Sequence, residues 1–442
     1  MSGSRLMRDA AKRAVAGGLL IGIAAMSTPV LPAPRDPKLD ALGQEIVRIV
    51  RESFYNPKTA EAWAKAHDHY GASAENRNEF NRKTRDALAE LKASHTAYYT
   101  PDDSRYYGLL SIFKGTLKAG PGEVESIGAD FTEEGFTRVV FPGGPAAKAG
   151  LLRGDKVLSA DGAPFQPVTS LKGKAGRSVS LKIERSTGST PQEIRVTPRK
   201  IDPGKEWLEA QQKGARLIER DGAIVAYVPL FSCAGEQYME ALQDALGDNL
   251  REAGALVVDF RDGWGGCNPD FVNVFNDQVP ALTNIGRDGE ERRYDPSWRK
   301  PLFILINDGT RSGKEVVSYA LQQHHRATLV GTRTAGAVLA GKPFLLSDKS
   351  LLYLAIADFL VDDKRLEGIG VSPDVEILSP LPYAAGADPQ LDKALDLARI
   401  PCSGDERTTR SPAAPASTGI PSAAGRSSPP CAARGRGCPT FP

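Results

Sequence analysis

Residues 302–315 read LFILINDGTRSGKE, an apolar run that passes through a polar turn into a second segment. Five consecutive apolar residues bounded by turn residues are typical of a buried strand, and we expect a helix from about Gly313 to Gln323. Ser312 then lies where the helix begins, beside backbone N–H groups that have no partner within the helix. A serine held in this way suits a nucleophile that faces a developing oxyanion. Serine is also a favoured N-cap, so simple capping is the alternative role of Ser312.

Strands and helices alternate on both sides of this stretch. Nearly continuous apolar runs occur at 223–230, 255–260 and 327–331, and a helical segment is expected at 235–251. Buried strands that alternate with helices indicate an α/β domain, which we place at residues 202–400.

Two other regions precede this domain. Residues 28–114 are predicted to be mostly helical, because apolar residues such as Leu42 and Ile46 recur three and four apart, with a break at Pro57. Residues 115–201 change to short strands punctuated by Gly and Pro, which predicts a small β-rich module.

The two ends of the chain differ from the body. In residues 1–27, four basic residues precede an apolar stretch that is too short to span a bilayer. This arrangement is typical of a secretory signal peptide. We therefore expect a periplasmic or secreted protein, with an uncleaved N-terminal anchor as the alternative. Residues 401–442 are rich in Ser, Pro, Ala, Gly and Arg and are predicted to be disordered. Cys233 and Cys267 lie in the body and three further cysteines in this tail, and their spacing assigns no pairing.

Composition narrows the possible partners. The 442 residues carry a net charge of only +2, and the basic excess lies at the two ends, so the body offers no basic surface for nucleic acid. No His, Cys or Asp cluster has the spacing of a metal site, and no phosphate-binding or dinucleotide fingerprint occurs. We therefore expect neither a metal nor a cofactor.

One motif in the β-rich module identifies it more closely. Residues 143–162, GGPAAKAGLLRGDKVLSADG, resemble the helix, turn and strand of a PDZ domain. By that resemblance the carboxylate-binding loop is formed by Ile127, Gly128, Ala129, Asp130 and Phe131. Such a loop receives the C-terminus of a peptide that adds to the sheet as a strand. The alternative is a β-barrel that binds no peptide.

Four motifs in order resemble the S41 family of C-terminal processing and tail-specific serine peptidases. They are VVDFRDGWGG at 257–266, NDGTRSGKE at 307–315, ATLVGTRTAG at 327–336 and LEGIGVSPDVEI at 366–377. The resemblance implies a crotonase- or ClpP-like fold, with Ser312 as nucleophile. It also implies an oxyanion hole made by backbone N–H groups of Gly265, Gly266 and Gly313, where the absence of side chains lets the backbone approach the substrate.

The general base departs from the better-known branch of the family. That branch uses a lysine about 25 residues after the serine, and Ala337 occupies the matching position. Lys342 and Lys314 are nearby, but each is interpreted as a solvated surface amine. We therefore expect no Ser–Lys dyad.

The tricorn-like branch uses histidine, in a stretch similar to LKASHTAYY at 91–99. This resemblance makes His95 the base, which Ser94 or Glu367 orients. Histidine titrates near neutrality, so it can take the serine proton and return it to the leaving amine. Glu367 could instead pair with Arg365.

Together these patterns predict an exported serine endopeptidase that cleaves unstructured or C-terminally exposed polypeptides. The alternative is a catalytically inactive relative that binds polypeptide termini through its PDZ domain. Among the charged neighbours of the motifs, Glu315 is expected to brace the serine turn. Asp259, Arg261 and Asp262 are expected to form structural ion pairs around the Gly-rich loop.

Overall fold

The computed structural model describes residues 36–118, 122–276, 278–295 and 297–399. The predicted signal peptide at 1–27, the predicted disordered tail at 401–442 and the three tail cysteines lie outside these residues. No helix within the described ranges has the length and apolar character needed to cross a membrane.

The first described region contains three helices. They are α1 (Pro37–Ser53), α2 (Pro57–Ala66) and α3 (Arg77–Ala89). The expected break occurs where predicted: Pro57 is the first residue of α2, and the side chain of Asn56 accepts a hydrogen bond from the Thr59 N–H. Apolar side chains on the inner faces of these helices, such as Ile46 and Phe80, are fully buried.

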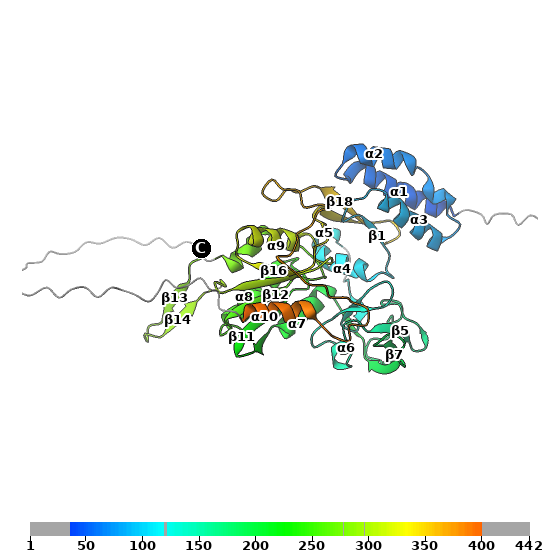
Figure 1. Ribbon diagram of the computed structural model, residues 1–442. Coiled ribbons are helices and arrows are strands. Elements are labelled where there is room, and N and C mark those ends of the chain that lie inside the picture. The colour runs from blue at the N-terminus through cyan, green and yellow to red at the C-terminus, as the bar shows by residue number, and fades with distance from the viewer. Residues whose placement is uncertain (1–35, 119–121, 277, 296, 400–442) are drawn as a thin grey trace, which may run out of the picture. The chain divides into compact units, whose positions relative to one another are not determined.

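This region is not helical throughout, which corrects the expectation for the segment that carries His95. After α3 the chain turns and forms β1 (Ala97–Tyr99), which pairs antiparallel with β18 (Leu351–Ala357). Strand β18 also pairs with β17 (Ala340–Leu345) in a three-stranded sheet. The turn that contains His95 is thus fixed to strands more than 250 residues later in the sequence. Figure 1 shows β1 and β18 side by side beneath the N-terminal helices.

The second region is rich in short strands. After α4 (Ser104–Ile112) and α5 (Lys114–Leu117), its elements are β2 (Val124–Ser126), β3 (Ala129–Phe131), β4 (Thr137–Val140), α6 (Pro145–Lys148), β5 (Lys156–Ala160), β6 (Ala163–Pro164), β7 (Val179–Glu184), β8 (Gln192–Val196) and β9 (Arg199–Ile201). It has its own apolar core, in which Ile127, Leu151 and Leu181 are almost completely buried. A core of this kind is expected of a β-rich module that folds around its own strands.

The third region is an α/β layer built on a six-stranded sheet. Its elements are α7 (Pro203–Gly214), β10 (Arg216–Arg220), β11 (Ala223–Pro229), α8 (Glu236–Gly247), β12 (Ala255–Asp259), β13 (Leu282–Ile285), β14 (Glu291–Tyr294), β15 (Leu302–Ile306), α9 (Gly313–Gln323), β16 (Thr328–Gly331), β19 (Val375–Glu376) and α10 (Pro389–Ala398). The strand order is β10-β11-β12-β15-β16-β19, and every pair except β10–β11 is parallel. Strands β13 and β14 form a separate hairpin.

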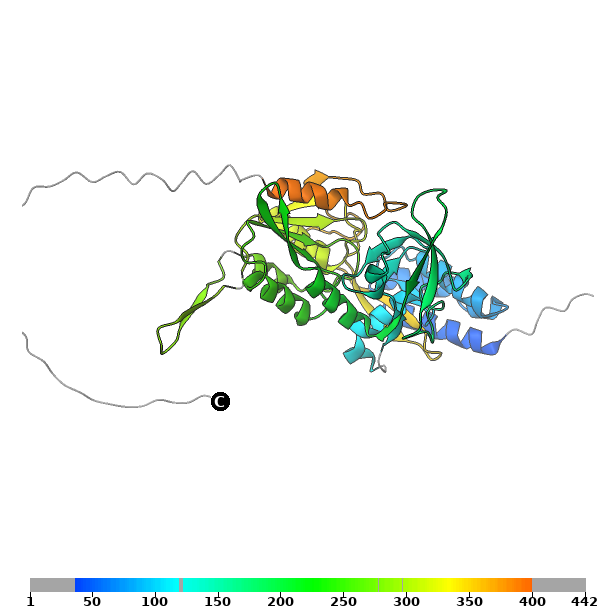
Figure 2. The ribbon, with the colours of Figure 1, turned by 90° about the horizontal axis from the view of Figure 1, so that it is seen from below.

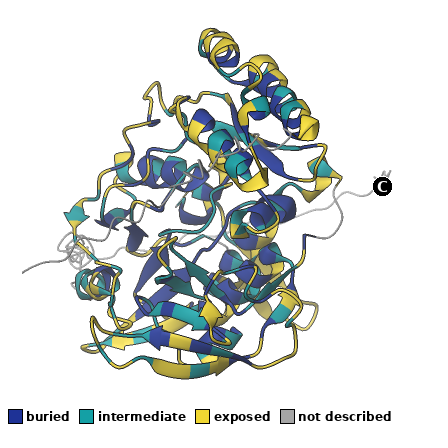
Figure 3. Cartoon of the chain, turned by 90° about the vertical axis from the view of Figure 1, so that its right-hand side faces the viewer, coloured by how far each residue is buried: buried dark blue, intermediate teal, exposed yellow. Residues whose placement is uncertain are grey.

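The two faces of this sheet are covered by different helices. Alternate residues of the strands, such as Val257 and Leu305, pack with α10, whereas their neighbours Val258 and Ile304 pack with α8 and α9. Both faces are therefore buried, as the continuous apolar runs predicted. Figure 2 shows α10 along one face of the sheet. Dark blue marks buried residues in Figure 3; these include most of the central strands β11, β12, β15 and β16, whereas the edge strand β10 is largely exposed. The mixed α/β architecture expected from the sequence is confirmed.

This topology places the chemistry-bearing motifs together. The carboxyl ends of β12, β15 and β16 lie at one edge of the parallel sheet, and open α/β sheets bind ligands in the crevice at that edge. The loops that leave these three strands contain the Gly-rich motif, Ser312 and the 332–339 segment. The candidate site is built there.

Candidate functional site

Ser312 is the last residue before α9, at the end of the loop that follows β15. We call residues 307–315, which comprise this loop and the first three residues of α9, the serine turn. Local contacts shape this turn: the Asn307 N–H donates to Thr310 Oγ1 at 3.0 Å, and the Thr310 N–H donates back to the Asn307 carbonyl oxygen at 2.9 Å. Ser312 itself has φ 57° and ψ −131°, in a region that a residue with a Cβ rarely adopts. Strained backbone of this kind persists only where its surroundings enforce it.

Glu315 is the group that enforces this conformation. It is fully buried, and its carboxylate accepts hydrogen bonds from the N–H groups of Ser312, Gly336 and Ala337 and from the hydroxyl of Thr334, over 2.6–3.2 Å. The Ser312 N–H is shared between two acceptors, because it also donates to the Ala337 carbonyl oxygen at 2.8 Å. Burial raises the pKa of Glu315, and the four donors act in the opposite direction. Glu315 therefore braces the serine turn, as predicted, and ties it to the 334–337 segment.

The predicted oxyanion residues pack closely around Ser312. A Cβ added to Gly265 would lie 2.6 Å from the Cβ of Ser312, and one added to Gly313 would lie 2.3 Å from the Cys267 carbonyl oxygen. Gly266 has φ 91°, and a Cβ added to it would lie 2.7 Å from the Cβ of Ala234. Side chains are excluded at all three positions, so backbone N–H groups can approach a reacting carbonyl from both the Gly-rich loop and the start of α9.

His95 and Ser94 lie in a second turn, Leu91–Thr96, which we call the histidine turn. His95 has φ 54°, and its Nδ1 lies 3.0 Å from Ser94 Oγ. Ser94 Oγ also donates to Glu367 Oε2 at 2.9 Å. Since a hydroxyl has one hydrogen to donate, His95 Nδ1 is the donor to Ser94, and Nε2 is left as an unprotonated acceptor. Within the described residues, His95 makes no hydrogen bond to Ser312.

Glu367 connects the histidine turn to the serine turn. Its carboxylate also accepts from the N–H groups of Ser94 at 3.0 Å, Val338 at 2.7 Å and Leu339 at 3.2 Å. Val338 directly follows Ala337, which accepts from Ser312. A continuous path of contacts therefore joins Ser312, the 337–339 segment, Glu367, Ser94 and His95. The alternative partner of Glu367, Arg365, bonds through its guanidinium to Asp358 and to the backbone carbonyl oxygen of Glu367 instead.

The surroundings of His95 keep its imidazole neutral. Burial lowers the pKa of His95 to about 4, and the positive charge of Arg311 acts in the same direction, while Glu367 acts against both. The ring also packs edge-on against Tyr353, with centroids 5.5 Å apart. At neutral pH the histidine is therefore uncharged, as a general base must be.

Lys314 corrects the interpretation of a surface amine. Its side chain is fully buried, and Nζ donates to the carbonyl oxygens of Leu230 at 2.6 Å and Asp262 at 2.9 Å. Burial lowers its pKa to about 7. Asp262 begins the loop that leads to Gly265, so Lys314 links the helix that starts after Ser312 to the predicted oxyanion loop. The sequence contained no signal for this contact, because Leu230 and Asp262 are more than 50 residues away.

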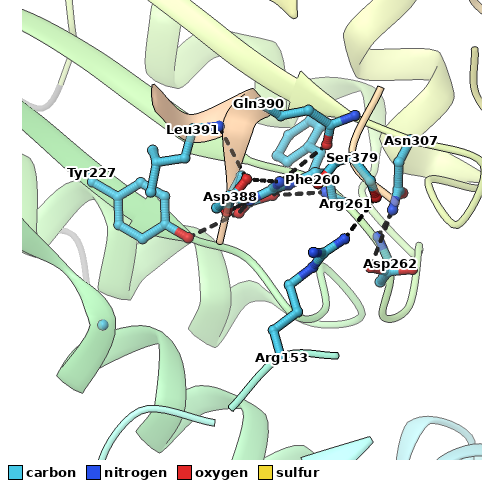
Figure 4. A network of polar contacts seen from close by, with 12 residues as sticks. Arg153, Tyr227, Phe260, Arg261, Asp262, Asn307, Ser379, Asp388, Gln390 and Leu391 are labelled. Atoms are coloured by element: carbon cyan, nitrogen blue, oxygen red, sulfur yellow. Dashed lines mark hydrogen bonds and ion pairs between the residues drawn. The ribbon is translucent and has the colours of Figure 1, made fainter. Parts of the chain in front are cut away.

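The Gly-rich loop is also fixed by a disulfide. Cys233, after β11, is bonded to Cys267, directly after Gly266. Asp259 and Arg261 form the expected ion pair at 2.6 Å, which Arg261 shares with Asp388. Asp262 is paired with Arg138 at 3.9 Å and also exchanges hydrogen bonds with Asn307. Figure 4 shows this network at the base of the Gly-rich loop.

Two cavities adjoin the serine turn. We call the first the apolar pocket; it has a volume of about 950 Å³, and its mouth is formed by Ser312, Gly313, Gly266 and Cys267. Most of its remaining wall is apolar: Pro269, Val272, Phe275, Val316, Ala320, Leu321, Val338, Phe359, Leu360 and Val361. We call the second the arginine crevice, a cavity of about 1080 Å³ that begins at Asn307, Asp308, Gly309 and Arg311.

The predicted carboxylate-binding loop consists of Ile127 and Gly128 followed by strand β3, which Ala129, Asp130 and Phe131 form. The N–H of Gly128, which has φ 77°, donates to Ser126 Oγ, while β3 pairs with β4 along one edge. Ile127, Ala129, Asp130 and Phe131 line a pocket of about 110 Å³ together with Val168 and Leu171. The same pocket reaches Trp264 of the Gly-rich loop, so the loop and the candidate site lie close together.

Known proteins resemble this chain in sequence and in fold. Residues 224–377 match Peptidase family S41, and residues 136–185 match the PDZ domain family. A carboxyl-terminal-processing protease of Synechocystis is 28% identical over 348 residues, which cover 73% of this chain and 77% of that protein. A carboxy-terminal-processing protease of Bartonella bacilliformis is 28% identical over 285 residues, which cover 59% and 63%. The tricorn protease shares the fold, with a TM-score of 0.50 and 19% identity over 82% of this chain and 36% of that chain.

Proposed function

We propose that Ser312 is the nucleophile and His95 the general base of a serine peptidase. The matches to Peptidase family S41 and to the PDZ domain family, together with the carboxyl-terminal-processing relatives, support this assignment. The observation that supports this assignment is the path of contacts from Ser312 through Glu367 and Ser94 to His95. Three segments far apart in the sequence contribute to it. A histidine with a free Nε2 and a hydrogen-bonded Nδ1 is the arrangement that general-base catalysis needs.

Each residue then has a defined part in peptide hydrolysis. Ser312 Oγ attacks the carbonyl carbon and its proton passes to His95 Nε2, while the N–H groups of Gly313 and the Gly265–Gly266 turn stabilise the oxyanion. His95 returns the proton to the leaving amine, and a water molecule then releases the acyl group by the same route. Ser94 and Glu367 orient the imidazole and stabilise the positive charge that it acquires.

The apolar pocket and the predicted carboxylate-binding loop indicate the substrate. The apolar pocket is lined by Ser312 and by two of the oxyanion glycines, so it suits an apolar side chain on the residue whose carbonyl is attacked. The carboxylate-binding loop of the PDZ domain receives a polypeptide terminus and raises its concentration at the site. The substrates are accordingly unstructured or C-terminally exposed polypeptides, consistent with the names of the carboxyl-terminal-processing relatives. The signal sequence at residues 1–27 directs the protein to the periplasm or the exterior.

Labelling with a fluorophosphonate probe tests the assignment of Ser312. The full chain is labelled in the wild type, in Ser312→Ala and in Ser318→Ala, a matched control. Ser318 is a buried serine on α9 whose hydroxyl has no hydrogen-bond partner among the described residues. We expect labelling to disappear in Ser312→Ala alone. An unlabelled wild type that still binds peptides would favour the alternative, a protein that holds polypeptide termini without cleaving them.

A further inference from the structure

The arginine crevice is lined by the part of the serine turn that precedes Ser312, whereas the apolar pocket is lined by Ser312 and Gly313. Its wall includes six arginines: Arg138, Arg153, Arg216, Arg261, Arg311 and Arg333. Five acidic residues also line it: Asp259, Asp262, Asp308, Glu376 and Asp388. Whether the crevice can bind an anion depends on which of these cations are already neutralised or hydrogen-bonded.

Several of the arginines have structural partners. Arg261 is neutralised by Asp259 and Asp388, and the Arg153 guanidinium donates to the carbonyl oxygens of three residues between Ser379 and Ala387. Figure 4 shows both guanidinium groups turned into this network. Arg216 donates to a carbonyl oxygen and lies over the Tyr227 ring, 4.5 Å from its centroid. These three side chains are held by the protein itself.

Arg311 is different. It is partly buried and directly precedes Ser312. The one hydrogen bond that its side chain makes within the described residues runs from Nε to the Gly309 carbonyl oxygen at 3.3 Å. No carboxylate of the described chain forms an ion pair with it. Its terminal nitrogens, which carry four of the five guanidinium N–H donors, therefore remain available to a ligand.

Two more arginines lie in the cavities around Arg311: Arg138 lines the same crevice, whereas Arg105 lines the pocket of about 110 Å³ beside the carboxylate-binding loop. Burial is the main cause that lowers the pKa of Arg311, and the charges of Arg105 and Arg138 act in the same direction. Arg105 stacks over Trp264, 5.5 Å from the ring centroid, and has no ion pair within the described residues. Arg138 is 3.9 Å from Asp262, whose carboxylate already accepts from Asn307. The arginine crevice therefore contains Arg311, which forms no ion pair within the described residues, and Arg138, which is paired with Asp262 at 3.9 Å.

We propose that Arg311, assisted by Arg138, binds a carboxylate of the substrate on the leaving side of the scissile bond. The inference rests on the proposed peptidase function and specifies its substrates further. A guanidinium binds a carboxylate through two parallel hydrogen bonds, which fixes position as well as charge. With the acyl side in the apolar pocket, the leaving segment is directed past Arg311 into the arginine crevice.

The carboxylate has two possible sources in a polypeptide. One is the chain terminus, in which case the enzyme cleaves within a few residues of the C-terminus. The other is an Asp or Glu side chain soon after the scissile bond. Both present the same group to Arg311, and paired peptides distinguish them.

Cleavage of matched peptides by the full chain tests the proposal. Each peptide has an apolar residue before the scissile bond and one to three residues after it, and it ends in a free acid or an amide. A second pair, both amidated, carries Asp or Asn after the bond. We expect the wild type to prefer one carboxylate-bearing member by roughly 10- to 100-fold in kcat/KM, as a lost hydrogen bond to a charged group predicts. The preferred pair identifies the source.

Arginine variants show which side chain binds the carboxylate of the substrate. Arg311→Met should abolish the preference, and Arg311→Lys should restore part of it. Arg333→Met is the matched control, because Arg333 lines the same crevice but is exposed and donates to Ile369 instead. A wild type with no preference overturns the proposal. So does a preference that survives Arg311→Met, because the carboxylate is then read elsewhere, for example by the PDZ loop.

Binding separates this inference from the peptidase function. The same peptides are titrated calorimetrically against Ser312→Ala and against Ser312→Ala with Arg311→Met. Tighter binding of the carboxylate member that disappears with Arg311→Met supports the site even if no peptide is cleaved. Equal binding of both members to both proteins overturns the site even if the wild type is labelled at Ser312.

Discussion

The serine turn and the histidine turn are both held by a buried glutamate that accepts four hydrogen bonds, but the two glutamates differ in reach. Glu315 lies three residues after Ser312 and braces a turn that belongs to one strand–turn–helix unit. Glu367 lies 273 residues from Ser94 and gathers donors from the histidine turn and from Val338 and Leu339. The proposed nucleophile is therefore positioned locally, whereas the proposed base is positioned only when the whole domain has folded.

This difference shows where the catalytic arrangement is vulnerable. Damage to a local brace disturbs the turn and its stability together. Damage to a long-range brace leaves each turn formed but changes their relation. Substitutions at the two turns should therefore separate loss of stability from loss of chemistry.

The largest effect is expected from the base itself. His95→Asn removes the proton acceptor and should lower kcat by about 1,000-fold or more. Asparagine tolerates the left-handed backbone at this position. His69→Asn is the matched control, because His69 has φ 55° against 54° for His95 but lies exposed beside Asp40. Steady-state kinetics give kcat for both variants and for the wild type. A kcat of His95→Asn within tenfold of the wild type would show that another group is the base.

The two glutamates should respond differently to amide substitution. Glu367→Gln removes the charge that supports His95, so kcat should fall by roughly 100-fold. Because the Glu367 charge raises the pKa of His95, its loss should also move the acidic limb of the pH–rate profile to lower pH. Glu315→Gln should mainly lower the free energy of unfolding, by about 1–3 kcal/mol, since a buried donor loses its acceptor.

Chemical denaturation and pH–rate profiles measured on both glutamate variants distinguish these roles. An acidic limb that moves in Glu315→Gln but not in Glu367→Gln would reverse the assignment.

The pH dependence of wild-type activity tests the surroundings of His95. His95 acts as a base only when neutral, and burial together with Arg311 lowers its pKa to about 4. Activity governed by His95 should therefore persist well below pH 6.5 and fall about tenfold per pH unit only below about pH 4. The profile of kcat/KM for the free enzyme measures this limb. A limb near pH 6.5 would mean that His95 is hydrated and lies outside the environment described.

The smallest effect is expected at Lys314, which connects the serine turn to the Gly-rich loop. Lys314→Met leaves the Leu230 and Asp262 carbonyl oxygens without a buried donor, and a shifted oxyanion loop should lower kcat by about tenfold, or ~1.4 kcal/mol. Lys300→Met is the matched control. Lys300 also donates to two carbonyl oxygens and also lies over an aromatic ring, but it is exposed and away from the site. Equal kcat values for the two variants would contradict a role for Lys314 in positioning the loop.

Most of the fold could be predicted because local patterns encode it. Continuous apolar runs marked β11, β12, β15 and β16, and the expected helix from Gly313 to Gln323 coincides with α9. The pairing of β1 with β18 could not be predicted, because three residues carry too weak a pattern to specify a partner over 250 residues away. For the same reason the histidine turn was expected in a helical segment and lies instead in a turn before a strand.

The local sequence was enough to place Ser312, since a strand, a turn and a helix in immediate succession put it directly before the first residue of α9. It also indicated which glycines could surround it. The folded structure was needed to show that Ser94 lies between His95 and Glu367, that Lys314 is buried and that Arg311 lines a crevice with Arg138. Burial and long-range hydrogen bonding set these roles, and both depend on which distant segments the folded chain brings into contact.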